Sequence, residues 1–394
     1  MLAPVAGFLL CCAGGRSGRR VNARRYGMGR GASASAAAGV LVLGCLGAAG
    51  GPATGDVSWV DAVWVNHLLW RAERFTNDLL AAEAACRQAL GVDPSEGRAI
   101  RSLVDIYARG GHVAMAAMSS WYGWELAGEE DLGTVFTGLW PRVESGAAVP
   151  GTGDVLQVAR EEFREAITAA REKVRQRNLV EAELILRGLL DRYPRNLAVL
   201  LHLGNIYVLA REWTMAAMAF GYAARLHPDN PDVANNLGLA LEQVGQVERA
   251  LSVFRQALER YPHADYLLIN CARIAERCDP ATARQCYPRL LELWPDNREY
   301  RLRYARLLVR EGELQEAHRQ YAELLRRDPE DADALLGMAT VAARGGDREE
   351  AGGWLERLGR VTSADRWKQI VARPEFQGIR LPGGIETQNG KQDL

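Results

Sequence analysis

Apolar residues in the second half of the chain recur at every third or fourth position, which is the period of an α-helix. Between residues 231 and 264 they form two faces separated by a polar break: Val233, Leu237, Leu241 and Val244, then Ala250, Phe254, Ala257 and Leu258. The pattern predicts two helices that pack through these faces. Because no stretch of this region alternates with period two, we expect an all-α fold without a sheet.

The pattern of this helix pair repeats along the chain with a period of 34 residues and one step of 33. Prolines keep this interval: Pro194, Pro228, Pro262, Pro295 and Pro329. So do alanines and a second set of small residues: Ala182, Ala216, Ala250, Ala283, Ala317 and Ala351, with Ala170, Gly204, Gly238, Ala272, Ala305 and Ala339. Four residues after each alanine of the first set stands a larger apolar or aromatic residue: Leu186, Phe220, Phe254, Tyr287, Tyr321 and Leu355. Small side chains let two helices approach closely, the larger one fills the space beside them, and Pro ends the unit because it lacks an N–H.

These units resemble the tetratricopeptide repeat family. The resemblance is strongest in two consecutive units: Leu203, Gly204, Tyr207, Ala216, Phe220, Ala223 and Pro228, then Leu237, Gly238, Leu241, Ala250, Phe254, Ala257 and Pro262. It implies a right-handed superhelical solenoid of antiparallel helix pairs, with about six units over residues 156–362. The unit at 265–297 is one residue short and has Pro288 in its second helix, where we expect a kink.

The flanking segments carry weaker signals. Two divergent helix pairs are expected over 56–128, because Ala82 and Ala116 lie 34 residues apart with Pro94 in phase. Residues 129–155 are rich in Gly, Pro and acidic residues and are expected to form a linker or irregular insertion. Residues 363–382, with Trp367 and Phe376, are expected to cover the open end of the array, and 383–394 to form a disordered tail.

The charge distribution excludes one class of partner. The chain has 48 Lys and Arg against 49 Asp and Glu, but six arginines precede the first acidic residue, Asp56: Arg16, Arg19, Arg20, Arg24, Arg25 and Arg30. The rest of the chain therefore has 42 basic residues against 49 acidic ones, a balance of about −7. General nucleic-acid binding needs a net basic surface, so we expect no nucleic-acid partner.

Residues 1–55 are expected to lie outside the fold, as an export signal, a lipoprotein-type segment or an anchor. An arginine cluster precedes the short apolar stretch 36–49, which is the order of an export signal. Val42-Leu43-Gly44-Cys45 resembles a bacterial lipoprotein box, in which Cys45 would carry the lipid. Cys45 as an apolar residue of a cleaved signal or weak anchor, and an organelle transit peptide, stay open. So does a start at Met28. We expect a protein exported to the cell envelope, periplasm-facing, with membrane contact only through this segment.

Motifs that carry catalytic chemistry are absent from the sequence. It contains no phosphate-binding glycine loop, no zinc-ligand spacing and no nucleophile elbow, and its six histidines are scattered. We therefore expect no enzyme activity, no cofactor and no metal. Cys271, Cys278 and Cys286 cluster in one unit. In an exported protein Cys278 and Cys286 would close a disulfide across the interhelical turn, and buried free thiols are the alternative.

The resemblance places the function on the surface that stacked units create. In this family the first helices of the units line a concave groove that holds extended peptides or partner helices. The matching positions carry eight polar residues: Asn205, Asn236, Asn270, Arg273, Arg277, Arg306, Arg310 and Arg344. Asparagines one period apart can bind a peptide backbone, because each both donates and accepts hydrogen bonds. Asparagine is also common in the family's general pattern, so a purely structural role stays open.

The arginines of this set form a more distinctive pattern. Arg277, Arg310 and Arg344 are spaced 33 and 34 residues apart, and Arg273 and Arg306 recur 33 apart. Stacking would align them as a basic stripe suited to bidentate capture of carboxylates or other anionic groups. Local pairing on the helix surface is the alternative, with these acidic residues: Glu276, Glu311, Glu313 and Glu316.

The sequence thus predicts a non-enzymatic interaction scaffold that binds an extended or helical, partly anionic protein or peptide segment. Cell-envelope assembly, secretion or polymer export is the expected setting. Two alternatives stay open: a binder of anionic polysaccharide, and a regulatory or scaffolding subunit of an enzyme complex. The sequence does not define the oligomeric state.

Overall fold

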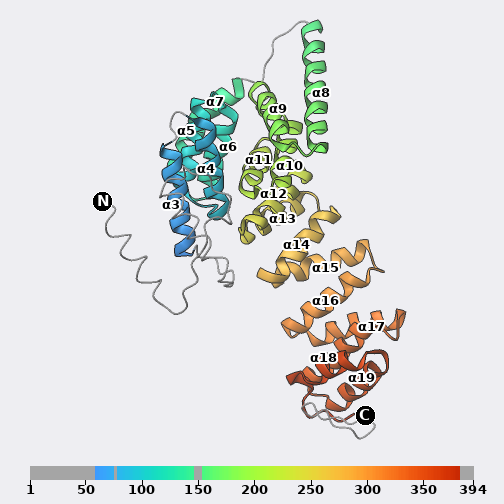
Figure 1. Ribbon diagram of the computed structural model, residues 1–394. Helices are drawn as coiled ribbons and strands as arrows, with labels where there is room; N and C mark the ends of the chain where they lie inside the picture. The colour runs from blue at the N-terminus through green and yellow to red at the C-terminus, as the bar shows by residue number, and fades with distance from the viewer. Residues whose placement is uncertain (1–57, 75–77, 146–152, 382–394) are drawn as a thin grey trace, which may run out of the picture. The chain divides into compact units, whose positions relative to one another are not determined.

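The computed structural model describes residues 58–74, 78–145 and 153–381, and the regular elements in these ranges are helices (Figure 1). The chain divides into two units, residues 1–56 and 57–394, and the described residues belong to the second. Its helices are α3 (Trp59–Arg74), α4 (Leu79–Val92), α5 (Gly97–Arg109), α6 (Val113–Glu125), α7 (Glu130–Ser145), α8 (Gly153–Arg175), α9 (Leu179–Arg192), α10 (Leu197–Leu209), α11 (Trp213–Leu226), α12 (Pro231–Val244), α13 (Val247–Arg260), α14 (Asp265–Cys278), α15 (Pro280–Leu293), α16 (Arg298–Glu311), α17 (Leu314–Arg327), α18 (Ala332–Gly345), α19 (Arg348–Val361), α20 (Ala364–Val371) and the 3-10 helix η2 (Pro374–Phe376). The all-α prediction is confirmed for this part of the chain.

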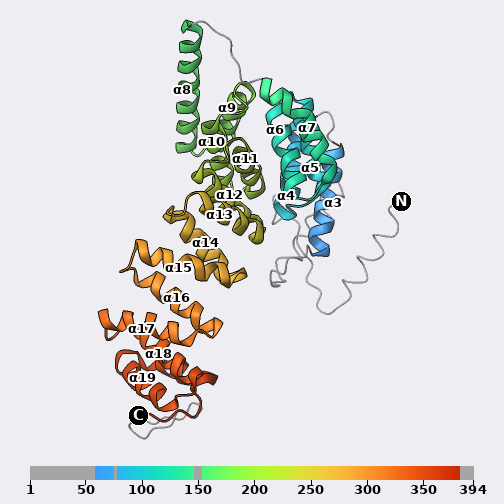
Figure 2. The ribbon, with the colours of Figure 1, turned by 180° about the vertical axis from the view of Figure 1, so that it is seen from behind.

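The helices pack in consecutive pairs. Within each unit the first helix contacts the second, as α10 contacts α11 and α16 contacts α17. The second helix then contacts the first helix of the next unit, as α11 contacts α12 and α17 contacts α18. Figures 1 and 2 show the helices from α8 to α19 following one another in chain order. This is the predicted solenoid, in which each unit covers the apolar face that its neighbour leaves open.

Local sequence explains where the helices begin and end. The side chains of Asn196, Asn230 and Asn297 cap the first helices of three units by accepting a hydrogen bond from a backbone N–H three residues ahead. The five repeat prolines lie in the turns between units. Gly245 ends α12 with φ 89°, in the left-handed region that glycine adopts without strain.

The predicted contact between a small residue and an aromatic ring holds each strong unit together. A Cβ atom built on Gly204 would lie 2.4 Å from the ring of Phe220, and one on Gly238 would lie 2.4 Å from the ring of Phe254. Real Cβ atoms do not approach that closely, so the two helices of these units are packed at glycine distance. Both rings are buried.

The structure corrects the prediction for residues 129–155, because most of this segment is helical. Helix α7 occupies Glu130–Ser145 and packs on α6, with Leu132, Phe136 and Val143 buried. These apolar residues recur with the period of a helix. Their burial stabilises the helix although Pro141 lies inside it. Pro288 lies inside α15, the second helix of its unit, where the sequence placed it. Gly and Pro therefore did not mark irregular structure here.

The C-terminal end of the array is covered by its last residues. Trp367 and Ile370 of α20 are buried, as are Phe376 and Ile379 beyond it. Helix η2 contacts α18, and a Cβ on Gly352 of α19 would lie 2.3 Å from the carbonyl oxygen of Arg380. This segment therefore shields the apolar face of the final pair. The expected tail, 383–394, lies outside the described residues.

Candidate partner-binding groove

The three asparagines of the predicted ladder occupy different surroundings. The Nδ2 of Asn270 on α14 donates to Oδ1 of Asn235 on α12 at 2.8 Å, and the Nδ2 of Asn235 is 3.4 Å from Oδ1 of Asn236. Asn235, which the repeat pattern did not single out, therefore joins two of the predicted residues. Asn205 on α10 is exposed and makes no side-chain hydrogen bond to another described residue. Asn236 and Asn270 are thus connected through Asn235, whereas Asn205 is separate from them.

Two of the predicted arginines meet at one buried carboxylate. Arg273 of α14 binds both oxygens of Glu242 at 2.6 Å, in the bidentate geometry that makes such pairs strong. Arg277, one turn later, lies 4.0 Å from the same carboxylate. The Glu242 side chain is only 9% exposed, whereas that of Arg277 is 71% exposed. Arg277 therefore presents most of its guanidinium to solvent beside a carboxylate already engaged by Arg273.

Arg306 and Arg310 line one hollow on the neighbouring first helix, α16. The hollow has a volume of about 250 Å³ and is also lined by Glu276, Glu299, Arg303 and Leu307. We call it the arginine hollow. Arg303 lies 2.6 Å from Glu299 and 3.6 Å from Glu276. Arg303 was not predicted, although it stands one 33-residue step after Asn270 of the predicted asparagines. Three guanidiniums against two carboxylates leave the lining with a net positive charge.

The remaining contacts of these arginines reach the adjoining units. Nη2 of Arg310 donates to the backbone carbonyl of Glu276 at 2.6 Å, and Nη1 of Arg344 donates to the carbonyl of Val309 at 2.9 Å. Both carbonyls lie in the last turn of the preceding first helix, and that of Val309 also accepts a hydrogen bond from the N–H of Gly312. Arg306 instead reaches Asp333 at 3.2 Å. The repeated arginines thus connect consecutive first helices.

None of the four acidic residues proposed for local pairing forms an ion pair with a predicted arginine in the described part of the chain. Glu276 borders the arginine hollow, and burial raises its pKa although Arg303, Arg310 and Arg306 oppose the shift. Two others pair with different arginines: Glu313 with Arg284 at 3.1 Å, and Glu316 with Arg319 at 2.8 Å. Sequence distance along one helix therefore did not identify the partners.

Of the two alternatives for Cys278 and Cys286, a disulfide or free thiols, the structure has free thiols. Cys286 is buried on α15 and hydrogen-bonds with Cys271 of α14, which raises the pKa of Cys271. Cys278 is exposed and donates to the carbonyl of Ile274 at 3.5 Å. Cys286 therefore meets Cys271, which lies about two turns before Cys278 on α14, and does not meet Cys278.

Other predicted features lie elsewhere or have no counterpart in the described ranges. Cys45 and the rest of the N-terminal segment lie outside the described residues. Within residues 58–74, 78–145 and 153–381, no helix has both the length and the apolar character needed to span a membrane. The same ranges contain no cluster of three or more His, Cys, Asp or Glu arranged to hold a metal ion.

Comparison with known proteins identifies the repeat. The family model described as tetratricopeptide repeat matches five overlapping stretches: residues 167–231, 210–265, 235–279, 275–317 and 305–364. Together they cover residues 167–364, half of the chain. The chain belongs to the tetratricopeptide repeat family.

Individual relatives match only parts of this tetratricopeptide repeat protein. Cellulose synthase operon protein C of Pseudomonas fluorescens (strain SBW25) is 28% identical over 149 residues, which are 36% of this chain and 11% of that protein. A tetratricopeptide repeat protein from Parabacteroides merdae is 22% identical, with 53% of this chain and 89% of that chain covered and a TM-score of 0.40. PilF of Pseudomonas aeruginosa is 22% identical, with coverages of 54% and 98% and a TM-score of 0.38. Neither likeness to a solved structure extends beyond the fold.

A second, unpredicted feature lies where the tetratricopeptide array contacts the helices before it. Side chains of α4 meet those of α9, and α6 packs on α11. Glu83, Arg87, Glu183, Arg187 and Glu212 form an ion cluster at this contact, which we call the junction cluster. Arg87 binds Glu183 at 2.9 Å and Arg187 binds Glu83 at 2.9 Å, so the two contacts are reciprocal.

The reciprocity extends to two buried tyrosines. Tyr107 donates to Glu83 at 3.0 Å, and Tyr207 donates to Glu183 at 3.0 Å. The Arg87 guanidinium lies 5.2 Å from the Tyr207 ring centre, and that of Arg187 lies 5.1 Å from the Tyr107 ring centre. Such exchange of equivalent contacts is the hallmark of a two-fold interface, here within one chain.

A sequence signal for this interface exists at an offset of 100 residues. Segment 79–126 matches segment 179–226 without a gap, and the identical pairs are Leu79/Leu179, Ala82/Ala182, Glu83/Glu183, Arg87/Arg187, Leu90/Leu190, Pro94/Pro194, Leu103/Leu203, Ile106/Ile206, Tyr107/Tyr207, Met115/Met215, Ala116/Ala216, Ala117/Ala217, Met118/Met218, Tyr122/Tyr222 and Leu126/Leu226. The 34-residue period hides this match, because it compares each unit only with its neighbours. Two related pairs of units therefore pack against each other.

Proposed function

We propose that this protein is a non-enzymatic scaffold whose first helices α12, α14, α16 and α18 hold an extended or helical partner segment that carries acidic groups. Tetratricopeptide repeat proteins generally bind protein partners, and the proposal adds the chemistry of the partner. Acidic side chains of the segment would pair with the exposed arginines, and its backbone would meet the asparagines.

The observation that carries the proposal is the arginine hollow together with its neighbour Arg277. The hollow has an excess of one guanidinium, and Arg310 forms no ion pair with a described carboxylate, because it donates to the backbone carbonyl of Glu276 instead. Arg277 is exposed beside Glu242, which Arg273 already engages. Guanidiniums without a dedicated carboxylate favour an anionic group that arrives from outside.

A setting in cell-envelope assembly, secretion or polymer export is part of the proposal. The charge order of residues 1–55 supports export, and we propose Cys45 as the lipid-bearing residue. The match to cellulose synthase operon protein C supports a role near a polymer, although it covers 11% of that protein. The excess guanidinium charge of the arginine hollow favours a second candidate function, the binding of an anionic polysaccharide along the arginines.

The experiment measures binding of defined probes to the full chain by fluorescence anisotropy. The probes are labelled peptides of equal length, one of Glu and Leu and one of Gln and Leu, with polygalacturonate as competitor. We expect the Glu peptide to bind more tightly than the Gln peptide. The double reversal Arg277→Glu/Arg310→Glu should abolish that preference and leave the thermal midpoint nearly unchanged, because neither residue is buried.

A matched control and a clear contrary result make this test decisive. Arg319→Glu reverses a 71% exposed arginine on α17, a second helix, and should leave peptide binding unchanged. Equal binding of the Glu peptide by the chain and its double reversal would refute the acidic-partner proposal. Displacement of the peptide by polygalacturonate at lower concentration than by unlabelled peptide would favour the polysaccharide instead.

A further inference from the structure

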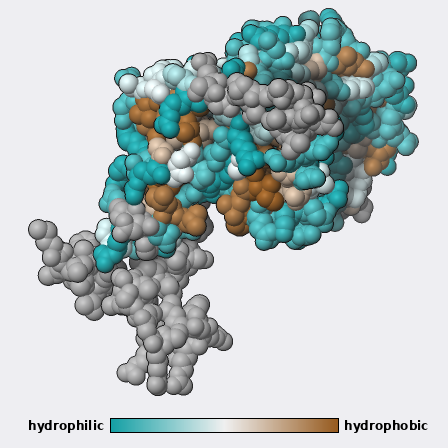
Figure 3. Space-filling view, turned by 90° about the horizontal axis from the view of Figure 1, so that it is seen from above, coloured by the Kyte–Doolittle hydropathy of each residue, from teal (hydrophilic) through white to brown (hydrophobic). Residues whose placement is uncertain are grey.

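A hollow of about 550 Å³ opens beside the junction cluster, between α4, α9 and the first turn of α11. We call it the junction hollow. Leu80, Val180 and Leu184 line it and are 72%, 69% and 54% exposed. Figure 3 shows that apolar side chains gather in patches on an otherwise hydrophilic surface. Single exposed apolar residues are ordinary, but three of them converging with Trp213 on one hollow of ligand size mark a binding surface.

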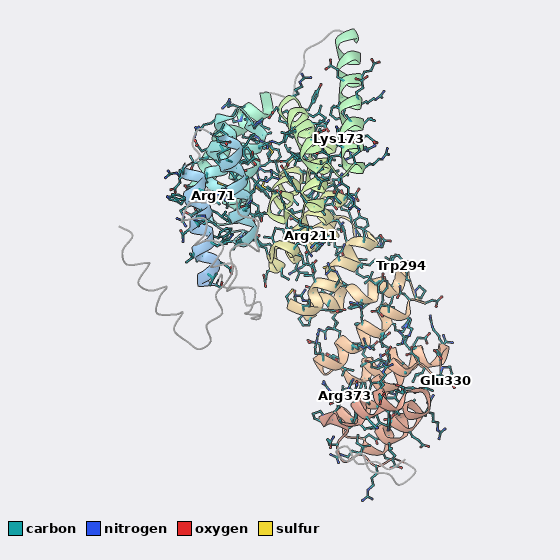
Figure 4. All side chains as sticks on the ribbon, in the orientation of Figure 1. Arg71, Lys173, Arg211, Trp294, Glu330 and Arg373 are labelled. Atoms are coloured by element: carbon teal, nitrogen blue, oxygen red, sulfur yellow. The ribbon has the colours of Figure 1, made fainter. Side chains whose placement is uncertain are left out.

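The junction cluster, which lines part of the junction hollow, contains three carboxylates and two guanidiniums. Glu83, Glu183 and Glu212 share Arg87 and Arg187, and Arg87 alone contacts all three, with its Nε 2.7 Å from Glu212. Arg211 also lines the hollow (labelled in Figure 4), but it is exposed and forms no ion pair within the described residues. The cluster therefore has one negative charge in excess.

The excess charge sits on one side of the two-fold contact only. Glu83, Arg87, Glu183 and Arg187 balance one another and occur in both copies of the 100-residue repeat. Glu212 has no acidic counterpart, because its equivalent is His112, which lies 2.8 Å from Asp191 instead. Glu212 is thus an addition to a balanced interface, and it lines the junction hollow.

Glu212 is placed where an incoming group could meet it. Its side chain is 35% exposed, whereas those of Glu83 and Glu183 are 6% and 11% exposed. Burial raises the pKa of Glu212 although Arg87 opposes the shift, so its ionised form is incompletely compensated. A cation beside Glu212 would stabilise its ionised carboxylate. The apolar residues that line the hollow would pack against the aliphatic part of the Lys or Arg side chain that carries this cation.

We propose that the junction hollow binds a partner segment that presents a Lys or Arg side chain on an apolar helical face. The apolar residues of this segment pack on Leu80, Val180 and Leu184, and its basic group pairs with Glu212. The lining of α4 runs from Leu80 to Gly91, which at 1.5 Å per residue is roughly 16 Å, or about three helical turns. This inference is independent of the acidic partner proposed for the arginine hollow.

The test uses the full chain and two labelled 14-residue amphipathic peptides, one of Leu and Lys and one of Leu and Glu, in anisotropy titrations at physiological ionic strength. We expect the Leu-Lys peptide to bind and Glu212→Gln to weaken it about tenfold, the effect of losing one charge-assisted contact. The amide can still accept a hydrogen bond from Arg87, so the fold is retained. Ala84→Trp, at an exposed position in the lining, fills the hollow and should weaken binding at least as much.

The control is Gly138→Trp on α7, at an exposed position where an added Cβ atom meets nothing within 4 Å and which does not line the hollow. It should bind the Leu-Lys peptide like the unaltered chain, and so should Arg277→Glu/Arg310→Glu. Failure of this peptide to bind, or equal binding by Glu212→Gln and the unaltered chain, overturns the proposal. Tighter binding of the Leu-Glu peptide overturns it as well, since that result would assign the hollow to an acidic segment.

Discussion

At the scale of single residues, Asp331 shows how one carboxylate joins two units. It caps α18 by accepting hydrogen bonds from the N–H groups of Asp333 and Ala334 at 3.0 and 3.2 Å. Its two oxygens also bind Arg298 of α16 at 2.6 and 2.7 Å. Asp331 is only 5% exposed, so these contacts replace the water that the charge loses.

We predict that Asp331→Asn lowers the free energy of unfolding by about 1–2 kcal/mol at pH 7, because Asn still caps the helix but loses the charge-assisted pair. Burial alone would raise the pKa of Asp331, yet Arg298 and the cap N–H groups hold it below its ordinary 3.8. Because the pKa of Asp331 is lower in the folded state than in the unfolded chain, its ionised carboxylate stabilises the fold at every pH above the unfolded-state pKa. This contribution disappears as the pH falls through the folded-state pKa.

Urea unfolding of the two proteins from pH 7 to pH 2 measures this difference. It should shrink below about pH 4 and vanish at the lowest pH. Asp347→Asn is the matched control, since Asp347 caps α19 but forms no ion pair with a described residue. A stability difference that stays constant over the whole range would show that charge at Asp331 plays no part.

At the scale of helices, the distance between the two helices of a unit depends on the missing side chain of a glycine. Gly238→Ala would place a methyl group 2.4 Å from the Phe254 ring, so the pair must separate or the ring must leave its rotamer. We predict a loss of about 1–3 kcal/mol of stability, measured by thermal or urea unfolding.

The same substitution at Gly188 should have the opposite sign. Gly188 lies inside α9, is exposed and would place its new methyl group in open space. Ala has a higher helix propensity than Gly, so we expect a gain of up to about 1 kcal/mol. If both variants lose stability equally, the close approach of Gly238 and Phe254 does not set the helix distance.

Helices and their pairing could be predicted from sequence because each repeated position has one local role. Gly238, Phe254 and the inter-unit prolines fall where the 34-residue period places them. The period does not say which neighbouring group a long side chain reaches. Arg310 therefore bonds a backbone carbonyl of the previous unit, and Arg273 finds Glu242, which the pattern did not mark.

Helix α7 shows a different limit of sequence reasoning. Its Gly and Pro residues predict a break in the helix, but Leu132, Phe136 and Val143 bury one face of the segment against α6. Gly133 serves that contact, since a Cβ there would lie 3.0 Å from the ring of Trp124. Tertiary burial outweighs a weak local preference, and a single sequence read by propensity does not contain the tertiary partner.

At the scale of the whole second unit, the junction cluster adds contacts that a simple solenoid lacks. Repeats in a solenoid contact their neighbours, so distant units are linked only through the units between them. Here Arg87 binds Glu183, 96 residues away, and Arg187 binds Glu83, 104 residues away. Buried charges of this kind contribute little when paired but cost much when one partner is removed.

We predict that Arg187→Met lowers stability by about 3–5 kcal/mol, because it leaves Glu83 buried with one guanidinium fewer. Hydrogen exchange should then quicken in α4, α6, α9 and α11, which meet at the junction, and change little in α16 to α19. Arg192→Met on the same helix is the control: its pair with Glu162 is exposed on both sides, so the loss should stay below about 1 kcal/mol. The double exchange Arg187→Glu/Glu83→Arg should restore part of the stability by reversing the pair. Equal loss in Arg187→Met and Arg192→Met, or faster exchange spread evenly to α19, would mean that the two related halves do not stabilise each other.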